Sequence, residues 1–137
     1  MAGYSGTPLV KKLGLKENFR VGLVNAPADF MGELGPLPAG ASFPDRLRKP
    51  LDLILLFAAN ESELRREFRK QAAKLSPSGM LWVAWPKKNS ATQSDLSFAV
   101  VQRIGLEEGL VDTKVCAIND IWSGLRFVIR LKDRKLP

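Results

Sequence analysis

The chain has 137 residues and a formal net charge of +7, with no histidine and a single cysteine, Cys116. The missing imidazole excludes Ser-His-Asp and Cys-His nucleophilic mechanisms and histidine-ligated metals, and one thiol excludes an intramolecular disulfide and a cysteine-rich zinc site. We therefore predict no metal site, and the length fits a single domain over residues 1–137.

The first part of the chain predicts few regular elements. Residues 1–6 are small and predict a flexible arm, a short helix should follow through Lys12, and residues 19–24 predict a strand. The segment 25–50 is rich in proline and glycine, and proline breaks a long helix. We therefore expect an irregular, truncated region there, with one helical turn at 28–34 and one short strand at 41–43.

The middle of the chain predicts a strand, a helix and a second strand. The apolar run at 51–58 is typical of a parallel strand buried on both faces. Asn60 and Glu63 have the spacing of a capping box and should begin a helix, which ends before a Ser-Pro-Ser-Gly turn at 76–79. A strand at 80–85 follows this turn.

The last part predicts a second helix and a hairpin. Apolar residues at helical spacing predict a helix over 95–108, with Ser94 as its cap. Strands are expected at 110–118 and 125–131. Their short link suits an antiparallel hairpin, because a parallel crossover needs a dozen or more residues. The alternation of strands and helices along the chain predicts an α/β fold. We expect a three-layer Rossmann-like open sheet that is mostly parallel, with a C-terminal antiparallel hairpin.

From residue 51 onward, this order of elements resembles the second half of a class I S-adenosylmethionine-dependent methyltransferase. The resemblance implies a degenerate version of that fold. Those proteins bind the cofactor with a glycine-rich loop after the first strand, but residues 25–29 here read Asn-Ala-Pro-Ala-Asp. The segment 25–50 is also too short for the family's two strands and two helices, because even one βαβ unit takes about 30 residues.

One acidic residue, Asp45, is a candidate for cofactor binding. It follows the first predicted strand by about 20 residues, where nucleotide-binding sheets place an acid that binds ribose. Because the preceding loop lacks glycine, we nonetheless predict no cofactor.

The whole chain also resembles a small bacterial family of uncharacterised proteins. The stretches that carry this resemblance are residues 2–9, 24–27, 81–88 and 122–130. It implies no established activity.

Ligands of open α/β sheets bind outside the carboxyl ends of the strands. The candidate ligand- or partner-binding residues at these ends are Asn25, Asn60, Lys87, Lys88, Asn119 and Trp122. Ammonium groups, amides and an indole suit an anionic or nucleotide-like ligand. Structural alternatives stay open: Asn60 can cap the helix, Asn25 can shape a turn, and Trp122, expected in an exposed hairpin loop, can fold back onto the core.

Three functions are therefore considered. The first is a non-catalytic Rossmann-like domain that binds a small anionic ligand or a protein partner at this rim. The second is a minimal S-adenosylmethionine-dependent methyltransferase, and the third is a nucleic-acid-binding protein that uses its dispersed basic residues. The chain has no signal-peptide pattern and no apolar run of the roughly 18 residues that a membrane span needs, so we expect a cytoplasmic protein without membrane contact.

Overall fold

The computed structural model describes residues 7–134; residues 1–6, predicted as a flexible arm, and 135–137 lie outside this part. Five strands form one sheet in the order β1-β2-β3-β5-β4. The strands are β1 (Val21–Val24), β2 (Leu51–Phe57), β3 (Leu75–Pro86), β4 (Leu110–Ala117) and β5 (Trp122–Ile129). The helices are α1 (Leu9–Leu13), α2 (Phe30–Leu34), α3 (Glu61–Ala72), α4 (Phe98–Glu107) and the 3₁₀ turn η1 (Leu131–Asp133).

The strand directions place four carboxyl ends at one edge of the sheet. β1, β2 and β3 are parallel, and β5 runs antiparallel to both β3 and β4. β4 therefore runs in the same direction as β3, so the ends of β1 to β4 and the start of β5 lie at the same edge, which we call the carboxyl edge. The predicted mostly parallel sheet with a C-terminal antiparallel hairpin is confirmed.

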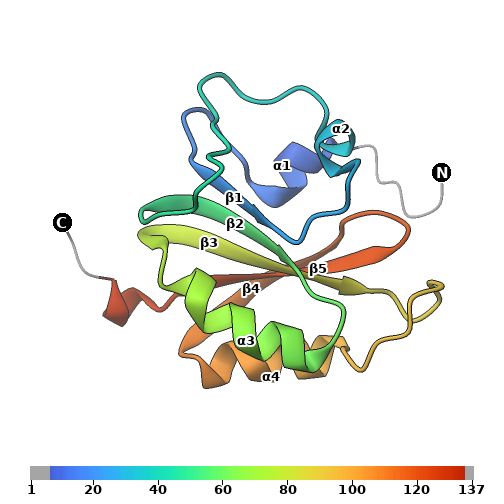
Figure 1. The fold of residues 1–137 in the computed structure, drawn as a ribbon. Helices are drawn as coiled ribbons and strands as arrows, with labels where there is room; N and C mark the ends of the chain where they lie inside the picture. Colours follow the sequence, from blue (N-terminus) through green and yellow to red (C-terminus); the bar gives the residue numbers. More distant parts are fainter. Residues whose placement is uncertain (1–6, 135–137) are drawn as a thin grey trace.

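Helices cover both faces of the sheet, which confirms the three layers. α1 and α2 lie on one face, and α3 and α4 on the other (Figure 1). In β2, Leu55 belongs to the apolar cluster under α1 and α2, whereas Ile54 and Leu56 belong to the cluster under α3 and α4. This double burial explains the continuous apolar run in the sequence. No helix within residues 7–134 is both long and apolar enough to span a membrane.

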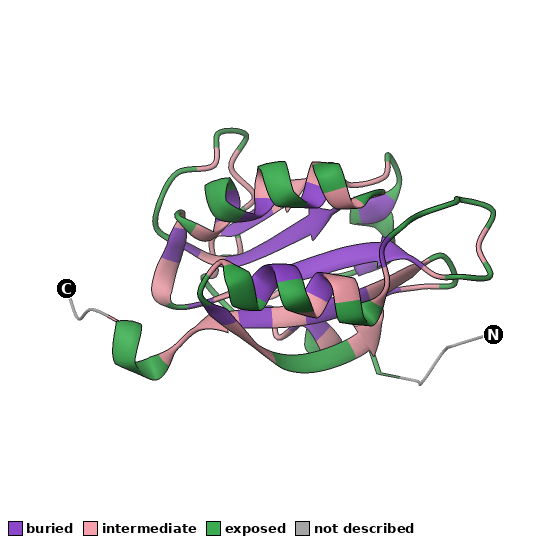
Figure 2. Cartoon of the chain, turned by 90° about the horizontal axis from the view of Figure 1, so that it is seen from below, coloured by how far each residue is buried: buried purple, intermediate pink, exposed green. Residues whose placement is uncertain are grey.

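Two capped helices form the α3/α4 layer, and both are buried on the side that faces the sheet (Figure 2). Asn60 Oδ1 accepts a hydrogen bond from Glu63 N at 2.9 Å, so the predicted cap of α3 is confirmed. The predicted start of α4 at Asp95 is wrong. Ser97, not Ser94, caps this helix by accepting from Val100 N at 3.3 Å, while Ser94 Oγ accepts from Leu96 N at 3.0 Å within the loop.

α4 packs closely against β5 at Gly105. A Cβ atom at this position would collide with the ring of Phe127, whose side chain is fully buried. Phe127 also stacks edge-on against Phe68 of α3, with ring centroids 5.3 Å apart. The close approach therefore lets one β5 side chain contact both helices.

Two further predictions about local structure are corrected. The predicted turn at 76–79 lies inside β3, where it forms a bulge between the pairs Leu51–Leu75 and Leu53–Met80. Gly79 permits this bulge because a Cβ there would lie 2.8 Å from the Leu51 carbonyl oxygen. The predicted strand at 41–43 is reduced to one bridge between Ser42 and Arg20. Outside α2 and this bridge, segment 25–50 is irregular, as its prolines and glycines predicted.

Candidate functional site

The carboxyl ends of β1 and β2 are filled by three aromatic side chains. Phe57, the last residue of β2, packs edge-on against Phe30 of α2 and against Trp122 of β5, with centroid distances of 5.0 Å in both pairs. Phe30 and Phe57 are buried and Trp122 is half-buried. We call these three side chains the aromatic plug, and the part of the carboxyl edge that they fill the closed half.

Trp122 is not the exposed loop residue that the sequence predicted. It is the first residue of β5, where it pairs with Pro86 of β3. The hairpin is therefore longer and its link shorter than expected, because β5 begins at Trp122 and not at Leu125. The alternative, in which Trp122 folds back onto the core, agrees with its contact on Phe57.

Asn119 holds the closed half together. Its Oδ1 accepts hydrogen bonds from the backbone N of Ile121 and of Trp122, both at 2.9 Å, and shapes the turn between β4 and β5. Its Nδ2 donates to Glu33 Oε1 at 2.8 Å and joins this turn to α2. The amide thus has structural partners on both of its ends.

Asn25 and Asn60 also have structural contacts. Asn25 adopts a positive φ of 58°, which asparagine tolerates better than most residues, and its Nδ2 donates to Phe57 O at 3.5 Å. It therefore shapes the turn after β1 and links this strand to β2. Asn60 uses its side-chain oxygen as the cap of α3.

Asp45 is exposed and follows the single bridge at Ser42. It makes no hydrogen bond or ion pair with any other residue of the described range. Two residues later, Leu47 lies at Gly22 in β1. The structure does not bring Asp45 into contact with the other candidate residues.

The end of β3 leads into an open, positively charged hollow. Its volume is about 340 Å³, and its lining consists of Pro86, Lys87, Lys88, Ser90, Thr92, Gln93, Ser94 and Leu96. Among the described residues that line it, Lys87 and Lys88 are the charged ones. We call this hollow the open half of the carboxyl edge.

The backbone of the open half is fixed, whereas its two ammonium groups are available. Lys87 N donates to Ile121 O at 2.8 Å, and Ser90 N donates to Lys87 O at 3.0 Å, which forms a turn. Lys87 is half-buried and Lys88 is exposed. Neither ammonium group has a hydrogen bond or an ion pair within residues 7–134. An anion entering the hollow would thus meet two ammonium groups that lack ion-pair partners. Asp95, between the lining residues Ser94 and Leu96, accepts a hydrogen bond from Glu61 N at 2.8 Å.

Four polar residues of this lining were not predicted as site residues from the sequence. Ser90, Thr92, Gln93 and Ser94 add hydroxyl and amide groups beside the lysines. The available signal was the polar run 87–94, interrupted only by Ala91, between a buried strand and a helix. Because a polar run of this kind is also typical of a solvated loop, only the fold shows that it encloses a hollow.

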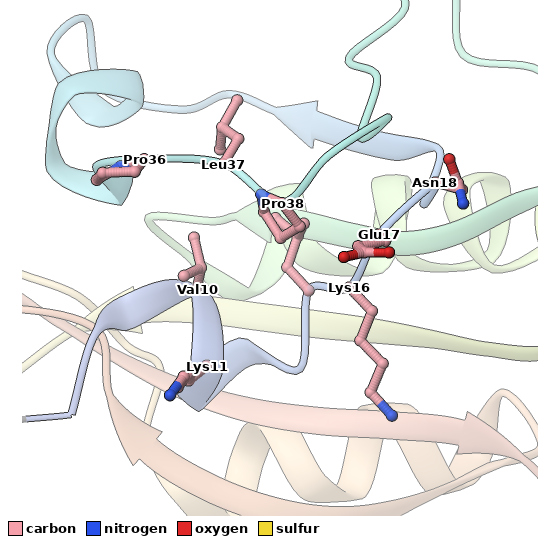
Figure 3. A pocket seen from close by; sticks show the side chains of 9 residues that line it. Val10, Lys11, Lys16, Glu17, Asn18, Pro36, Leu37 and Pro38 are labelled. Atoms are coloured by element: carbon pink, nitrogen blue, oxygen red, sulfur yellow. The ribbon is translucent and has the colours of Figure 1, made fainter.

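A second hollow lies on the α1/α2 face (Figure 3). Its volume is about 810 Å³, and it is lined by Val10, Lys11, Leu15, Lys16, Glu17, Asn18, Pro36, Leu37 and Pro38. The side chains of Lys11 and Lys16 extend away from it, on the side of α1 opposite to Pro36 and Pro38 (Figure 3). This hollow contains none of the predicted site residues.

Comparison with known proteins identifies the fold. No protein-family model matches the chain, and no curated protein matches it in sequence. A SAM-dependent methyltransferase from Aquifex aeolicus has a similar structure, with a TM-score of 0.60 and 15% identity over 89% of this chain and 88% of that one.

Two further solved structures give the same result. The ribosomal protein L11 methylase from Lactobacillus delbrueckii subsp. bulgaricus has a TM-score of 0.61 and 10% identity, over 89% of this chain and 75% of that one. Magnesium protoporphyrin IX methyltransferase from Synechocystis PCC 6803 has a TM-score of 0.57 and 11% identity, over 89% and 78% respectively. The resemblance to a small bacterial family stays a prediction, whereas the chain has the Rossmann-like α/β fold of class I methyltransferases.

Proposed function

We propose that this chain is a non-catalytic domain on a methyltransferase fold that binds a small anionic ligand in the open half of its carboxyl edge. The observation that carries the proposal is the pair Lys87 and Lys88, which line a hollow without any lining carboxylate. The volume of about 340 Å³ lies near the lower end of the range for ligand pockets and suits a compact ligand.

The chemistry of the lining favours a phosphate-like group. Lysine acts as a compact point charge that suits phosphate, and hydrogen bonds between charged partners are about twice as strong as neutral ones. Lys87 is half-buried, and its ammonium group has no hydrogen-bond or ion-pair partner among residues 7–134. A bound anion would supply this partner. The hydroxyl group of Thr92 could donate a further hydrogen bond, whereas that of Ser90 already donates to the Thr92 carbonyl oxygen at 3.4 Å.

The closed half supports a non-catalytic role. The methyltransferase resemblance places S-adenosylmethionine at the end of the first strand, against a glycine-rich loop. Here Asn25, Ala26 and Pro27 occupy that loop, and the aromatic plug fills the space beside β2. These residues do not fit the cofactor at that position, and we assign no methyl-transfer step.

The proposal is tested by titration calorimetry with inorganic pyrophosphate at low ionic strength. The variant Lys87→Glu/Lys88→Glu should bind at least ten-fold more weakly than the native chain. The matched control is Lys70→Glu/Lys132→Glu, whose two exposed lysines lie on α3 and η1. Both variants lower the net charge from +7 to +3, since each substitution removes two units (7 − 4 = 3), but the control should retain binding within about three-fold.

Equal weakening in both variants would show that only the overall charge matters. Absence of any heat from pyrophosphate at millimolar concentration would overturn the proposal and favour a protein partner at the same rim.

The fold itself favours a second candidate, a minimal methyltransferase, because the solved structures named above are methyltransferases. Titration with S-adenosylmethionine separates the two functions. Binding at micromolar cofactor would favour the enzyme, and no heat at millimolar cofactor would exclude it in practical terms.

A further inference from the structure

Basic residues that are far apart in the sequence come together beside α1. Lys12 lies on α1, Lys114 on β4 and Arg126 on β5. Lys114 Nζ donates to the Lys12 carbonyl oxygen at 3.2 Å, and Lys12 Nζ donates to the Ala117 carbonyl oxygen at 3.5 Å. The fold therefore joins α1 to the hairpin through two lysine side chains.

Arg126 belongs to the same cluster. Its Nε donates to Thr113 Oγ1 at 2.8 Å, and its guanidinium lies 5.9 Å from the ring centre of Trp82. Its Nη1 also lies 3.9 Å from the position that a Cβ atom of Gly14, at the end of α1, would take. Arg126 is thus held in place by a hydroxyl group and an aromatic ring.

The half-buried thiol of Cys116 shows that the three charges act on one place. Burial raises the pKa of Cys116, while the charges of Lys12, Lys114 and Arg126 all act in the opposite direction. The field at this part of the hairpin is therefore positive.

Neutral groups, and not carboxylates, hold these cations. Within residues 7–134, Lys12, Lys114 and Arg126 form no ion pair, and their hydrogen-bond acceptors are carbonyl and hydroxyl oxygens. Asp112, also on β4, accepts a hydrogen bond from Gln102 of α4 on the opposite face of the sheet. The three positive charges are consequently fixed in position but not neutralised.

Two further exposed lysines lie close to Lys12 along the chain. Lys11 lies on α1 and Lys16 shortly after it, and both side chains extend away from the apolar hollow (Figure 3). Neither has an ion pair with a described residue, and Glu17 is the neighbouring acid along the chain. We call the five residues Lys11, Lys12, Lys16, Lys114 and Arg126 the cationic patch.

We propose that the cationic patch docks the phosphodiester backbone of double-stranded nucleic acid. Charge complementarity is the basis, because phosphate contacts made by Lys and Arg position a protein on nucleic acid without reading its sequence. Within residues 7–134, the aromatic ring that contacts the patch is that of Trp82, which is fully buried and offers no platform for base stacking. A duplex bound through its backbone, without sequence preference, therefore suits the patch better than a single strand.

The test is fluorescence anisotropy with a labelled 16-base-pair DNA duplex over a range of salt concentrations. For the native chain, log K should fall with log salt with a slope of about −3 to −4.5, because each phosphate contact contributes about −0.9. The variant Lys11→Gln/Lys16→Gln/Lys114→Gln should reduce the slope by about 2 to 3 and weaken binding at low salt at least ten-fold.

A matched control distinguishes this patch from net charge. Lys49→Gln/Lys70→Gln/Lys132→Gln removes three exposed lysines elsewhere and gives the same net charge of +4 (7 − 3 = 4). This variant should stay within about three-fold of the native affinity. The proposal is overturned if both triple variants lose affinity equally, if the native chain forms no complex at low salt, or if polyglutamate competes as well as unlabelled duplex.

Discussion

The two halves of the carboxyl edge use the same strand ends in opposite ways. In the closed half, the loop after β1 carries α2 back across the sheet, and Phe30, Phe57 and Trp122 interlock over the end of β2. In the open half, the loop after β3 leaves Lys87 and Lys88 beside a hollow. The difference shows that strand ends on the same edge of one sheet can be either packed with side chains or left open, depending on the loops that follow them.

The asparagine residues illustrate the same contrast. Asn119 in the closed half has hydrogen bonds to α2 and to the hairpin turn. Asn89, in the loop after β3 but outside the lining of the hollow, is exposed and has none with another described residue. The two asparagines therefore differ in role: Asn119 is structural, whereas Asn89 has no structural partner among the described residues.

The largest expected effect comes from emptying the closed half. Phe57→Ala should destabilise the fold by about 3–5 kcal/mol, because it removes a buried ring and leaves a cavity between Phe30 and Trp122. Urea unfolding measures this change, and Phe98→Ala, at a ring that is 43% exposed, should cost less than about 1 kcal/mol. A decrease in the free energy of unfolding of less than about 1 kcal/mol for Phe57→Ala would show that the three rings of the aromatic plug are not closely packed.

A smaller effect is expected from the paired asparagines. Asn119→Ala should cost about 1–3 kcal/mol, because it removes the acceptor for Ile121 N and Trp122 N and the donor to Glu33. Asn89→Ala should change the free energy of unfolding by less than about 0.5 kcal/mol. Similar values for the two variants would remove the distinction between the halves.

The smallest effect concerns Asn60, which lies between the end of β2 and the start of α3. Asn60→Ala should destabilise α3 by about 1 kcal/mol, because Glu63 N loses its side-chain acceptor. Asn60→Asp keeps this acceptor and should remain close to the native stability in thermal unfolding. If Asn60→Asp lowers the free energy of unfolding as much as Asn60→Ala does, Asn60 does not stabilise α3 through its cap.

Local patterns predicted the elements whose signals lie within a few residues. The apolar run of β2 and the capping box at Asn60 and Glu63 were sufficient for the central strand and for α3. The start of α4 was misplaced because Ser94 and Ser97 are both good caps, and the choice depends on where the helix meets the sheet. The turn signal at 76–79 was also misleading, since pairing with β2 extends the strand through a bulge.

The candidate site was predicted only in part. Sequence reasoning identified Lys87 and Lys88, because they follow a buried strand, and it could not separate them from Asn25, Asn119 and Trp122, which also lie at strand ends. To separate the lysines from these three residues, their partners in space must be known. Asn25 donates to the backbone carbonyl of Phe57, Trp122 packs on the Phe57 ring, and Asn119 donates to the Glu33 carboxylate.

The sequence by itself determined the fold class, the parallel core and the loss of a glycine-rich loop after β1, because these depend on hydrophobic period and backbone freedom within short windows. Only the tertiary structure decided which strand ends are closed and where charge accumulates. Both depend on contacts between residues distant in the chain, such as Phe30 with Phe57 and Lys12 with Lys114. Burial and electrostatic potential are sums over neighbours in space, and the sequence lists only neighbours along the chain.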